Sequence, residues 1–299
     1  MILVAGEALV DVFADGSARP GGSPFNVAIA LARLGSSVAL ATQISEDAHG
    51  RLLRSALERE GVDMHYLRPS PRPSPTATVS LEGSGSPSYS FTGLAELEVH
   101  PLGPIGDMTC FHTGSYGIVS RRSSAALLDS FATAPPGVLR SLDPNIRLSM
   151  EPSGARWRSG VAAFAAHADL IKLSEEDIRT LFGPDADVDS IARGWLSERC
   201  ALVGLTRGER GASLFTQGGG RIDSPVFPTA VIDTVGAGDA FQAALIAGLD
   251  DAGHCSPRAL KSLGGEHLQG LLDTATKASA LACARPGADP PTRSQLDAD

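Results

Sequence analysis

The 299-residue chain lacks the features that mark several large classes of protein. It has no long basic run and carries a formal net charge of −9 at pH 7, which argues against nucleic acid or an anionic membrane surface as a general partner. No apolar run approaches the length of a membrane span. We therefore expect small-molecule partners, no nucleic-acid partner and no membrane association.

Cysteine is also scarce, and its pattern favours reduced thiols in a cytoplasm, most of them filling the core. There is no CxxC pair and no histidine at zinc-ligand spacing. The apolar opening segment has no basic region and is interrupted by Glu7 and Asp11, so we interpret it as a buried first strand and not as a signal peptide. A cytoplasmic location is the expectation. The four cysteines are Cys110, Cys200, Cys255 and Cys283.

What the sequence does contain is a regular alternation of strand-like and helix-like segments. Helices are predicted over 24–34, closed by Gly35, from a Ser45 cap to Gly61, and from about Ser120 onward. This alternation indicates an α/β fold with a largely parallel sheet covered by helices on both faces. The apolar runs predicted as strands are residues 1–6, 37–43, 109–115, 137–143, 168–173 and 200–206.

One stretch breaks this rhythm. Residues 76–91 contain two β-like runs around a Gly/Ser turn, after a proline-rich loop. They predict a hairpin that stands off the main sheet, and periodicity alone leaves open whether it serves a site or is only an edge hairpin. Because the chain has no internal repeat and no long low-complexity linker, we expect one domain, 1–299, with this appendage.

The segment VIDTVGAGDAF, residues 231–241, places glycines and an acid where a strand-like run gives way to a helix-like one. Backbone N–H groups at a helix start have no intrahelical partner, and glycines let a phosphate approach the backbone closely. A carboxylate in the first turn, Asp239, can also accept a proton from a hydroxyl held beside such a cradle. The alternative is that Asp239 only caps the helix and that the glycines only form the turn.

Other phosphate-binding motifs do not account for this turn. No GxxxxGK[ST] is present, which disfavours a Walker-type NTPase. A dinucleotide-binding GxGxxG would need a glycine where Phe241 stands and would normally follow the first strand. Nicotinamide binding is therefore a weak interpretation.

A second polar cluster lies early in the chain. Asp11 follows the first predicted strand, and ligands of parallel sheets collect beyond the carboxyl ends of strands, so this carboxylate can bind sugar hydroxyls. Gly21 and Gly22 permit close approach of the backbone, and Asn26 offers both a donor and an acceptor. A polyol requires that mixture, although each residue alone also fits an ordinary turn or helix face.

Together these segments resemble a known family. GGSPFNVA and DTVGAGDAF are similar to the two signatures of the ribokinase-like (PfkB) carbohydrate kinases. The similarity in order and spacing extends over essentially the whole chain, and GEALVD, LDPNIRL, ADLIKLSEED and ARPGADPPTR resemble the fructokinase branch most closely. The resemblance implies a three-layer α/β/α fold with a mostly parallel central sheet and a small β lid.

The resemblance also implies an activity, the transfer of the γ-phosphate of ATP to a primary hydroxyl of a sugar. Asp239 is then the base. The backbone N–H groups of Ala237, Gly238 and Asp239, which follow Gly236, form the anion hole for the transferred group. The substrate-binding residues that the resemblance implies are Asp11, Gly21, Gly22, Asn26, Asp143, Asn145 and Arg147.

The nucleotide and the ions are assigned through the same resemblance. Asp177 stands where the family has a residue associated with magnesium, and Asp233 belongs to a site for a monovalent cation such as potassium. For Ser174 and Asp177 the alternative is a helix capping box. The residues that resemble the ATP-binding positions of the family are Lys172, Ser174, Thr206, Gly208 and Gly211.

The chain departs from the family pattern in two places. Only nine residues separate Asp11 from Gly21, so the lid is expected to be small and to depend on 76–91. Leu97 stands where many fructokinases carry an arginine. These departures keep open a nucleoside kinase, a 2-keto-3-deoxy sugar acid kinase, or a non-catalytic protein that binds sugar or nucleotide. They also keep open a homodimer whose partner chain completes the lid.

Overall fold

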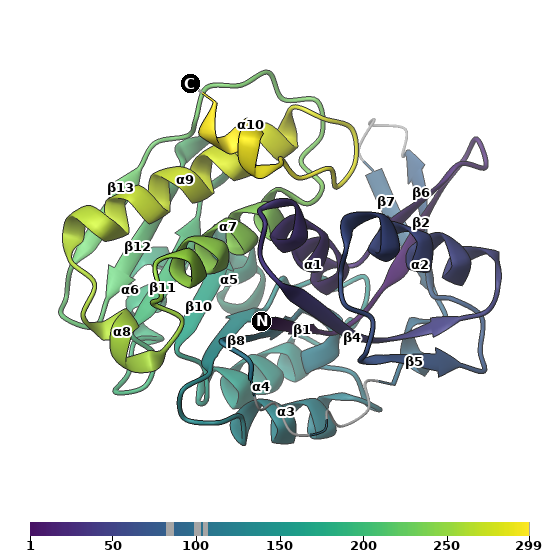
Figure 1. Ribbon diagram of the computed structural model, residues 1–299, viewed down its shortest axis with the longest axis horizontal. Helices are drawn as coiled ribbons and strands as arrows, with labels where there is room; N and C mark the ends of the chain where they lie inside the picture. Colours follow the sequence, from purple (N-terminus) through teal and green to yellow (C-terminus); the bar gives the residue numbers. More distant parts are fainter. Residues whose placement is uncertain (82–86, 99–102, 104–106, 299) are drawn as a thin grey trace.

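The computed structural model describes residues 1–81, 87–98, 103 and 107–298, and its main sheet has nine strands in the order β13-β12-β11-β10-β9-β8-β1-β4-β5 (Figure 1). Neighbouring strands are parallel from β5 to β11. At the other edge, the pairs β11–β12 and β12–β13 are antiparallel. The predicted mostly parallel sheet is therefore confirmed. The strands are β1 (Ile2–Ala5), β4 (Val38–Ser45), β5 (Leu67–Ser70), β8 (Cys110–Gly114), β9 (Leu139–Asp143), β10 (Leu170–Ser174), β11 (Leu202–Thr206), β12 (Ala212–Thr216) and β13 (Arg221–Ser224).

Helices cover both faces of this sheet (Figure 1). Because side chains alternate across a strand, Ile2 and Val4 pack toward α1, α2, α7 and α9, whereas Leu3 and Ala5 pack toward α3, α4, α5 and α6. Burial on both faces explains the continuous apolar runs of the sequence. The helices are α1 (Ser23–Arg33), α2 (Ala48–Glu60), α3 (Ser124–Ala132), α4 (Gly154–Ala165), α5 (Glu175–Phe182), α6 (Val188–Gly194), α7 (Ala237–Asp251), α8 (Pro257–Lys261), α9 (Gly265–Cys283) and α10 (Arg293–Asp297), with 3₁₀ helices η1 (Leu94–Glu96), η2 (Ser115–Ile118) and η3 (Gly208–Arg210).

A second, smaller sheet stands beside the first, with the strand order β3-β2-β6-β7. β2 (Leu9–Phe13) and β3 (Ala18–Gly21) form a hairpin, and β6 (Thr76–Leu81) pairs antiparallel with β7 (Pro87–Thr92). The parallel pair β2–β6 joins the two halves. The smaller sheet was expected, but the stretch before α1 adds two strands that the sequence analysis did not predict, and Asp11 lies within β2 instead of after β1.

Two helix starts also differ from the sequence prediction. Ser45 is the last residue of β4, and α2 begins after Asp47, whose Oδ1 accepts the N–H of Gly50 at 2.7 Å. Asp47 therefore provides the N-cap that was assigned to Ser45. Ser120 follows η2, and α3 begins only at Ser124.

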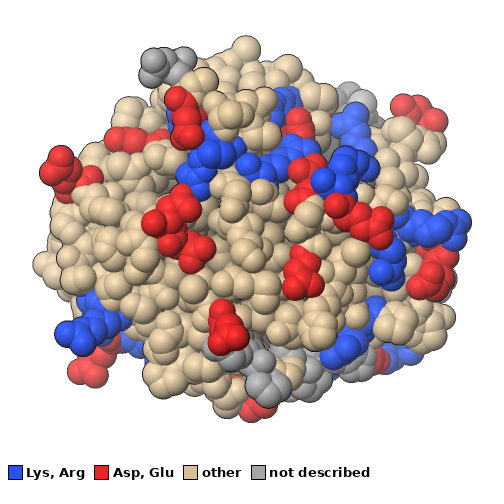
Figure 2. All heavy atoms as spheres, viewed as in Figure 1, with Lys and Arg blue, Asp and Glu red and all other residues tan. Residues whose placement is uncertain are grey.

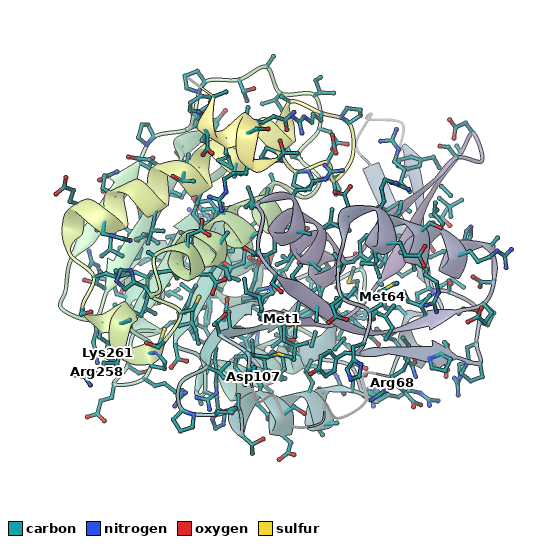
Figure 3. The ribbon with its side chains drawn as sticks, in the orientation of Figure 1. Met1, Met64, Arg68, Asp107, Arg258 and Lys261 are labelled. Atoms are coloured by element: carbon teal, nitrogen blue, oxygen red, sulfur yellow. The ribbon has the colours of Figure 1, made fainter. Side chains whose placement is uncertain are left out.

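The surface view mixes acidic and basic side chains over the visible face (Figure 2). Arg258 and Lys261 of α8 lie at the end of the molecule opposite the smaller sheet (Figure 3). Within the described residues, no helix combines the length and the apolar character that crossing a membrane requires. All four cysteines are free thiols.

Candidate active site

The carboxyl ends of β9, β10 and β11 place polar side chains side by side at one edge of the main sheet. Asp143 ends β9, and Ser174 and Thr206 end β10 and β11, where they pair in register. Lys172 lies two residues before Ser174 on β10. Ligands of parallel sheets collect at this edge. Four residues that the sequence analysis assigned to substrate or nucleotide binding therefore stand on neighbouring strands.

Two helices, α1 and α7, direct their N-termini to one carboxylate, that of Asp239. Its Oδ1 accepts a hydrogen bond from Ser23 Oγ at 2.6 Å, and its Oδ2 accepts one from Asn26 Nδ2 at 2.8 Å. Ser23 and Asn26 lie three residues apart on α1, so both project from the same face. The partial positive charge at each helix start favours an anion here. The two signature segments, 21–28 and 233–241, therefore meet at Asp239.

The protonation of Asp239 follows from its surroundings. The side chain is buried, with 6% of the residue exposed, and this burial raises the pKa of Asp239 above its ordinary value. The hydrogen bonds from Ser23 and Asn26 and the positive charges of Lys172 and Arg147 act in the opposite direction. A carboxylate with a raised pKa accepts a proton more readily, which suits a general base.

In the first turn of α7, glycines let other groups come close to the backbone. Gly236 is the N-cap residue in the left-handed region, with φ +76°. The N–H of Ala237 donates to the carbonyl of Thr234 at 3.3 Å, and the N–H groups of Gly238 and Asp239 have no acceptor within the helix. A Cβ at Gly238 would lie 2.7 Å from Lys172 Nζ. The missing side chain lets the ammonium group reach the helix start.

Lys172 forms a buried ion pair with Asp143, and its Nζ donates to Asp143 Oδ2 at 2.9 Å. Burial opposes the charge of Lys172, but the carboxylates of Asp143, Asp177 and Asp239 raise its pKa above the ordinary value. Burial raises the pKa of Asp143 to about 6, against the effect of Lys172. A charged ammonium group beside free helix N–H groups can bind a phosphoryl group.

Asp11 lies in the same region. A Cβ at Gly21 would lie 2.7 Å from Asp11 Oδ2, and Gly21 precedes Ser23 by two residues. Burial raises the pKa of Asp11 to about 6, and the charge of Asp233 contributes to the rise. Asp233 in turn precedes Asp239 by six residues. Asp11 therefore lies beside Gly21, just before α1, and within electrostatic reach of Asp233, just before α7.

Asp233 ties the loop before α7 to the loop after α9. Its Oδ1 accepts the N–H of Val235 at 3.1 Å, and its Oδ2 accepts the N–H of Gly287 at 2.8 Å. The N–H groups of Ile232 and Asp233 both donate to the carbonyl of Cys283. The structure thus places Asp233, which the sequence analysis assigned to a monovalent-cation site, against the segment ARPGADPPTR that follows α9.

The loop after β9 carries the remaining substrate-binding predictions. Asn145 is in the left-handed region, with φ +40°, which asparagine tolerates better than most residues, and its N–H donates to Asp143 Oδ1 at 3.2 Å. Arg147 is exposed and donates to the carbonyl of Ile146. The loop therefore presents Asn145 and Arg147 near the buried pair.

Asp177 and Ser174 form the capping box that the sequence analysis kept as an alternative. Asp177 Oδ2 accepts hydrogen bonds from the N–H of Ser174 at 2.8 Å and from the hydroxyl of Ser174 at 2.6 Å. The other oxygen of Asp177, Oδ1, accepts the N–H of Ile146 at 2.7 Å. In the described part of the chain, no group of three or more His, Cys, Asp or Glu residues is placed to hold a metal ion. The side chains alone therefore do not form a Mg²⁺ cage. Mg²⁺ usually binds through one or two carboxylates together with substrate phosphates.

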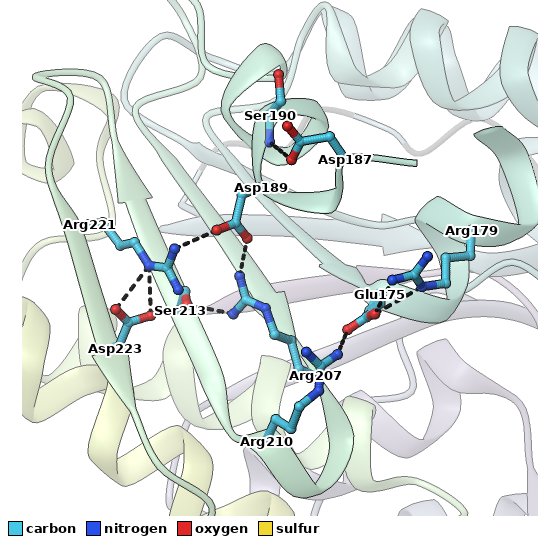
Figure 4. A network of polar contacts seen from close by, with 10 residues as sticks. All are labelled: Glu175, Arg179, Asp187, Asp189, Ser190, Arg207, Arg210, Ser213, Arg221 and Asp223. Atoms are coloured by element: carbon cyan, nitrogen blue, oxygen red, sulfur yellow. Dashed lines mark hydrogen bonds and ion pairs between the residues drawn. The ribbon is translucent and has the colours of Figure 1, made fainter. Parts of the chain in front are cut away.

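The segment after β11 is held by the charged network of Figure 4. Arg207 bonds to Asp189 of α6 and to Ser213 of β12, and Arg210 pairs with Glu175 of α5. These contacts fasten the stretch that contains Gly208 to α5 and α6. Two more of the predicted nucleotide-binding residues flank this stretch: Thr206 ends β11, and a Cβ at Gly211 would lie 2.1 Å from the carbonyl oxygen of Ser224.

Sequence reasoning missed two residues near Asp239. Ser23 could have been found, because it lies three residues before Asn26 and therefore on the same helix face. Glu7 follows β1 and is fully buried. Its Oε2 accepts the N–H of Gly117 at 3.3 Å, and its Oε1 has no hydrogen-bond partner among the described residues. Burial raises the pKa of Glu7 to about 7, and the charge of Asp239 contributes to the rise.

Comparisons with known proteins identify the family to which the chain is similar. A family model described as pfkB family carbohydrate kinase matches residues 6–295. A fructokinase from Klebsiella pneumoniae is 34% identical over 275 residues, which cover 88% of each chain. A crystal structure of aminoimidazole riboside kinase from Salmonella enterica, with aminoimidazole riboside and an ATP analogue, is 27% identical at a TM-score of 0.84 over 99% of this chain and 98% of that one. A crystal structure of a fructokinase double mutant from Vibrio cholerae, with fructose, ADP and potassium ion bound, is 25% identical. Its TM-score is 0.82, and the match covers 99% of this chain and 96% of that chain.

Proposed function

The chain belongs to the pfkB family of carbohydrate kinases and has the ribokinase-like three-layer fold, and we propose that it is a fructokinase-like enzyme that phosphorylates a primary hydroxyl of a sugar with ATP as donor. The observation that carries this proposal is the convergence of two helix N-termini and a buried ammonium group on Asp239. Fructose is the expected acceptor, because the 34% identical relative is a fructokinase.

Asp239 is the proposed general base. The oxygen of the sugar hydroxyl forms a bond to the γ-phosphorus, the bond from that phosphorus to the β–γ bridging oxygen breaks, and ADP leaves with the bridging oxygen. The hydroxyl proton passes to a carboxylate oxygen of Asp239. A loose transition state requires little early removal of this proton, so the carboxylate mainly orients the hydroxyl and accepts the proton late.

The start of α7 is the proposed site for the transferred phosphoryl group. Its charge is spread over equatorial oxygens, which hydrogen-bond donors can stabilise. The N–H groups of Gly238 and Asp239 are free for this role, whereas that of Ala237 would have to leave the carbonyl of Thr234. Lys172 beside Gly238 adds a full positive charge, held in place by its ion pair.

The sugar is proposed to lie between the smaller sheet and the start of α1. Asp11 accepts hydrogen bonds from sugar hydroxyls. The missing side chain of Gly21 lets the Asp11 carboxylate lie against the backbone there, and that of Gly22 lets the backbone lie against the carbonyl oxygen of Glu7. Asn26 donates one amide hydrogen to Asp239 and keeps its carbonyl oxygen for the substrate. The remaining predicted substrate contacts are Asp143 at the end of β9 and Asn145 and Arg147 in the loop that follows.

ATP is proposed to contact the carboxyl ends of β10 and β11, with Ser174, Thr206, Gly208 and Gly211. Mg²⁺ would neutralise charge on the ATP phosphates, with Asp177 as its proposed protein residue, and Asp233 is proposed for a monovalent cation such as potassium. A cytoplasmic location and a homodimer remain predictions.

The proposal is tested by measuring ADP release and sugar phosphate formation with ATP and a panel of acceptors. The panel contains fructose, other free sugars, a riboside and a 2-keto-3-deoxy sugar acid. We expect fructose to give the highest kcat/KM and a product phosphorylated on a primary hydroxyl. Tight sugar binding without ADP release for any acceptor would contradict the proposal and favour a non-catalytic binding protein.

A nucleoside kinase is the second candidate. The specific observation in its favour is the likeness to aminoimidazole riboside kinase, which has a TM-score of 0.84. A riboside offers a furanose ring with a primary hydroxyl, as fructose does, so the same base and anion hole could serve both. A higher kcat/KM for the riboside than for fructose in the same panel would select this alternative.

A further inference from the structure

We propose that Ser23 is a positioning residue for phosphoryl transfer, because its hydroxyl holds one oxygen of Asp239 while Asn26 holds the other; this inference rests on the proposed role of Asp239 as the base. The distances are 2.6 Å from Ser23 Oγ to Oδ1 and 2.8 Å from Asn26 Nδ2 to Oδ2. Both donors lie in the first turn of α1, a rigid element packed directly against α7. The plane of the Asp239 carboxyl group is thus fixed by α1, and the Cα of Asp239 is fixed by α7.

The contact is not ordinary helix capping. A serine at a helix start usually accepts an N–H of its own helix through its hydroxyl oxygen. The N-cap residue of α1 is Gly22, no side chain caps this helix, and Ser23 donates its hydroxyl hydrogen to a residue 216 positions away. The Ser23 hydroxyl therefore binds the Asp239 carboxylate on α7 and does not cap its own helix.

Holding both oxygens has a chemical consequence. An ionised carboxylate offers about two acceptor positions on each oxygen, and α1 occupies one position on each. The carboxyl group cannot rotate without breaking one of these bonds, so its remaining acceptor positions point in fixed directions. A substrate hydroxyl that reaches one of them finds the acceptor already oriented, which lowers the barrier through preorganisation.

Other charged groups lie around Asp239, and their charges also affect its titration. Lys172 on β10 and Arg147 after β9 are positive. Asp143 at the end of β9 and Glu7 after β1 are acidic, and both titrate in the same electrostatic neighbourhood. Loss of the Ser23 hydroxyl changes none of these groups, whereas it removes a hydrogen bond that favours the ionised form of Asp239.

The decisive variant is Ser23→Ala, with Ser23→Thr to restore a hydroxyl. We expect kcat to fall about tenfold in Ser23→Ala, as loss of a hydrogen bond to a charged group predicts, with sugar KM changed less than about twofold. The acid limb of the kcat profile should move to higher pH, because the carboxylate becomes harder to form. Ser23→Thr should recover most of the activity and return the limb toward its original position.

Ser130→Ala is the matched control, because Ser130 is similarly buried and, among the described residues, its hydroxyl donates to the carbonyl of Ala126 within its own helix α3. It should leave kcat and the pH profile unchanged. The proposal is overturned if Ser23→Ala keeps the original acid limb, whether kcat falls or not, or if Ser23→Thr recovers nothing while folding normally in a thermal unfolding test.

A second readout separates this proposal from the proposed function. Carboxyl ¹³C NMR of aspartate-labelled protein follows the titration of Asp239 without any substrate, and Asp239→Asn identifies its signal. An upward shift of that pKa in Ser23→Ala, absent from Ser130→Ala, supports the positioning contact even if no acceptor is phosphorylated. An unchanged titration overturns it, whatever the activity of the unmodified chain.

Discussion

At the scale of single residues, the site holds several acids in surroundings that disfavour their charge. Burial raises the pKa of Glu7 to about 7 and those of Asp11 and Asp143 to about 6. Glu7 is the extreme case, because it is fully buried and the charge of Asp239 adds to the rise of its pKa. Below pH 4.5 the folded and unfolded states both bind its proton, and above pH 7 both have released it. Between these values mainly the folded state holds the proton, so stability falls as pH rises.

Glu7→Gln should therefore stabilise the protein at pH 8 and leave it almost unchanged at pH 4.5. Glutamine keeps the acceptor for the N–H of Gly117 and carries no charge. A rise of the pKa from 4.5 to about 7 sets an upper limit of about 3 kcal/mol on the gain. Denaturant unfolding of both proteins at the two pH values measures it. An equal difference at pH 4.5 and pH 8 would show that ionisation of Glu7 is not the cause.

At the scale of elements, the start of α7 depends on a missing side chain. A Cβ at Gly238 would lie 2.7 Å from Lys172 Nζ, and Lys172 cannot withdraw easily because it is buried and paired with Asp143. Gly270 in α9 is the matched control, since nothing lies within 4 Å of the Cβ it would gain.

Gly238→Ala should lower kcat by at least about tenfold, because displacing the ammonium group removes charge stabilisation from the transferred group. Gly270→Ala should leave kcat unchanged and stabilise α9 by about 0.5–1 kcal/mol, as expected when alanine replaces an exposed glycine within a helix. Steady-state kinetics and thermal unfolding of the two variants provide the comparison. Full activity in Gly238→Ala would mean that Lys172 does not act at this turn.

Sequence patterns predicted the long elements well and the short ones poorly. The buried strands β4 and β9 to β11 follow continuous apolar runs of the sequence, and α1 and α7 follow the helix-like segments of the two signature motifs, so their positions could be read directly. β3 contains Pro20 and Gly21, residues that disfavour strands, and only its pairing with β2 makes it extended. Such a strand is defined by its tertiary neighbour and not by its own residues.

At the scale of the whole molecule, the fold brings two distant parts of the chain to one place. Asn26 and Asp239, both predicted as site residues, are in direct contact. The ion pair of Lys172 with Asp143 spans 29 residues, and the bond from Ser23 to Asp239 spans 216. The sequence predicted a set of site residues, but it could not show which of them contact one another. These contacts depend on how side chains from different layers of the fold pack against one another.

The central claim is that Asp239 accepts the proton in a site shared by both ends of the chain. The most direct test is the kcat of Asp239→Asn with saturating ATP and fructose, compared with Asp11→Asn. We predict that Asp239→Asn lowers kcat by about 10²- to 10⁴-fold while ATP still binds, and that Asp11→Asn mainly raises the fructose KM. Turnover of Asp239→Asn close to that of the unmodified protein would contradict the account.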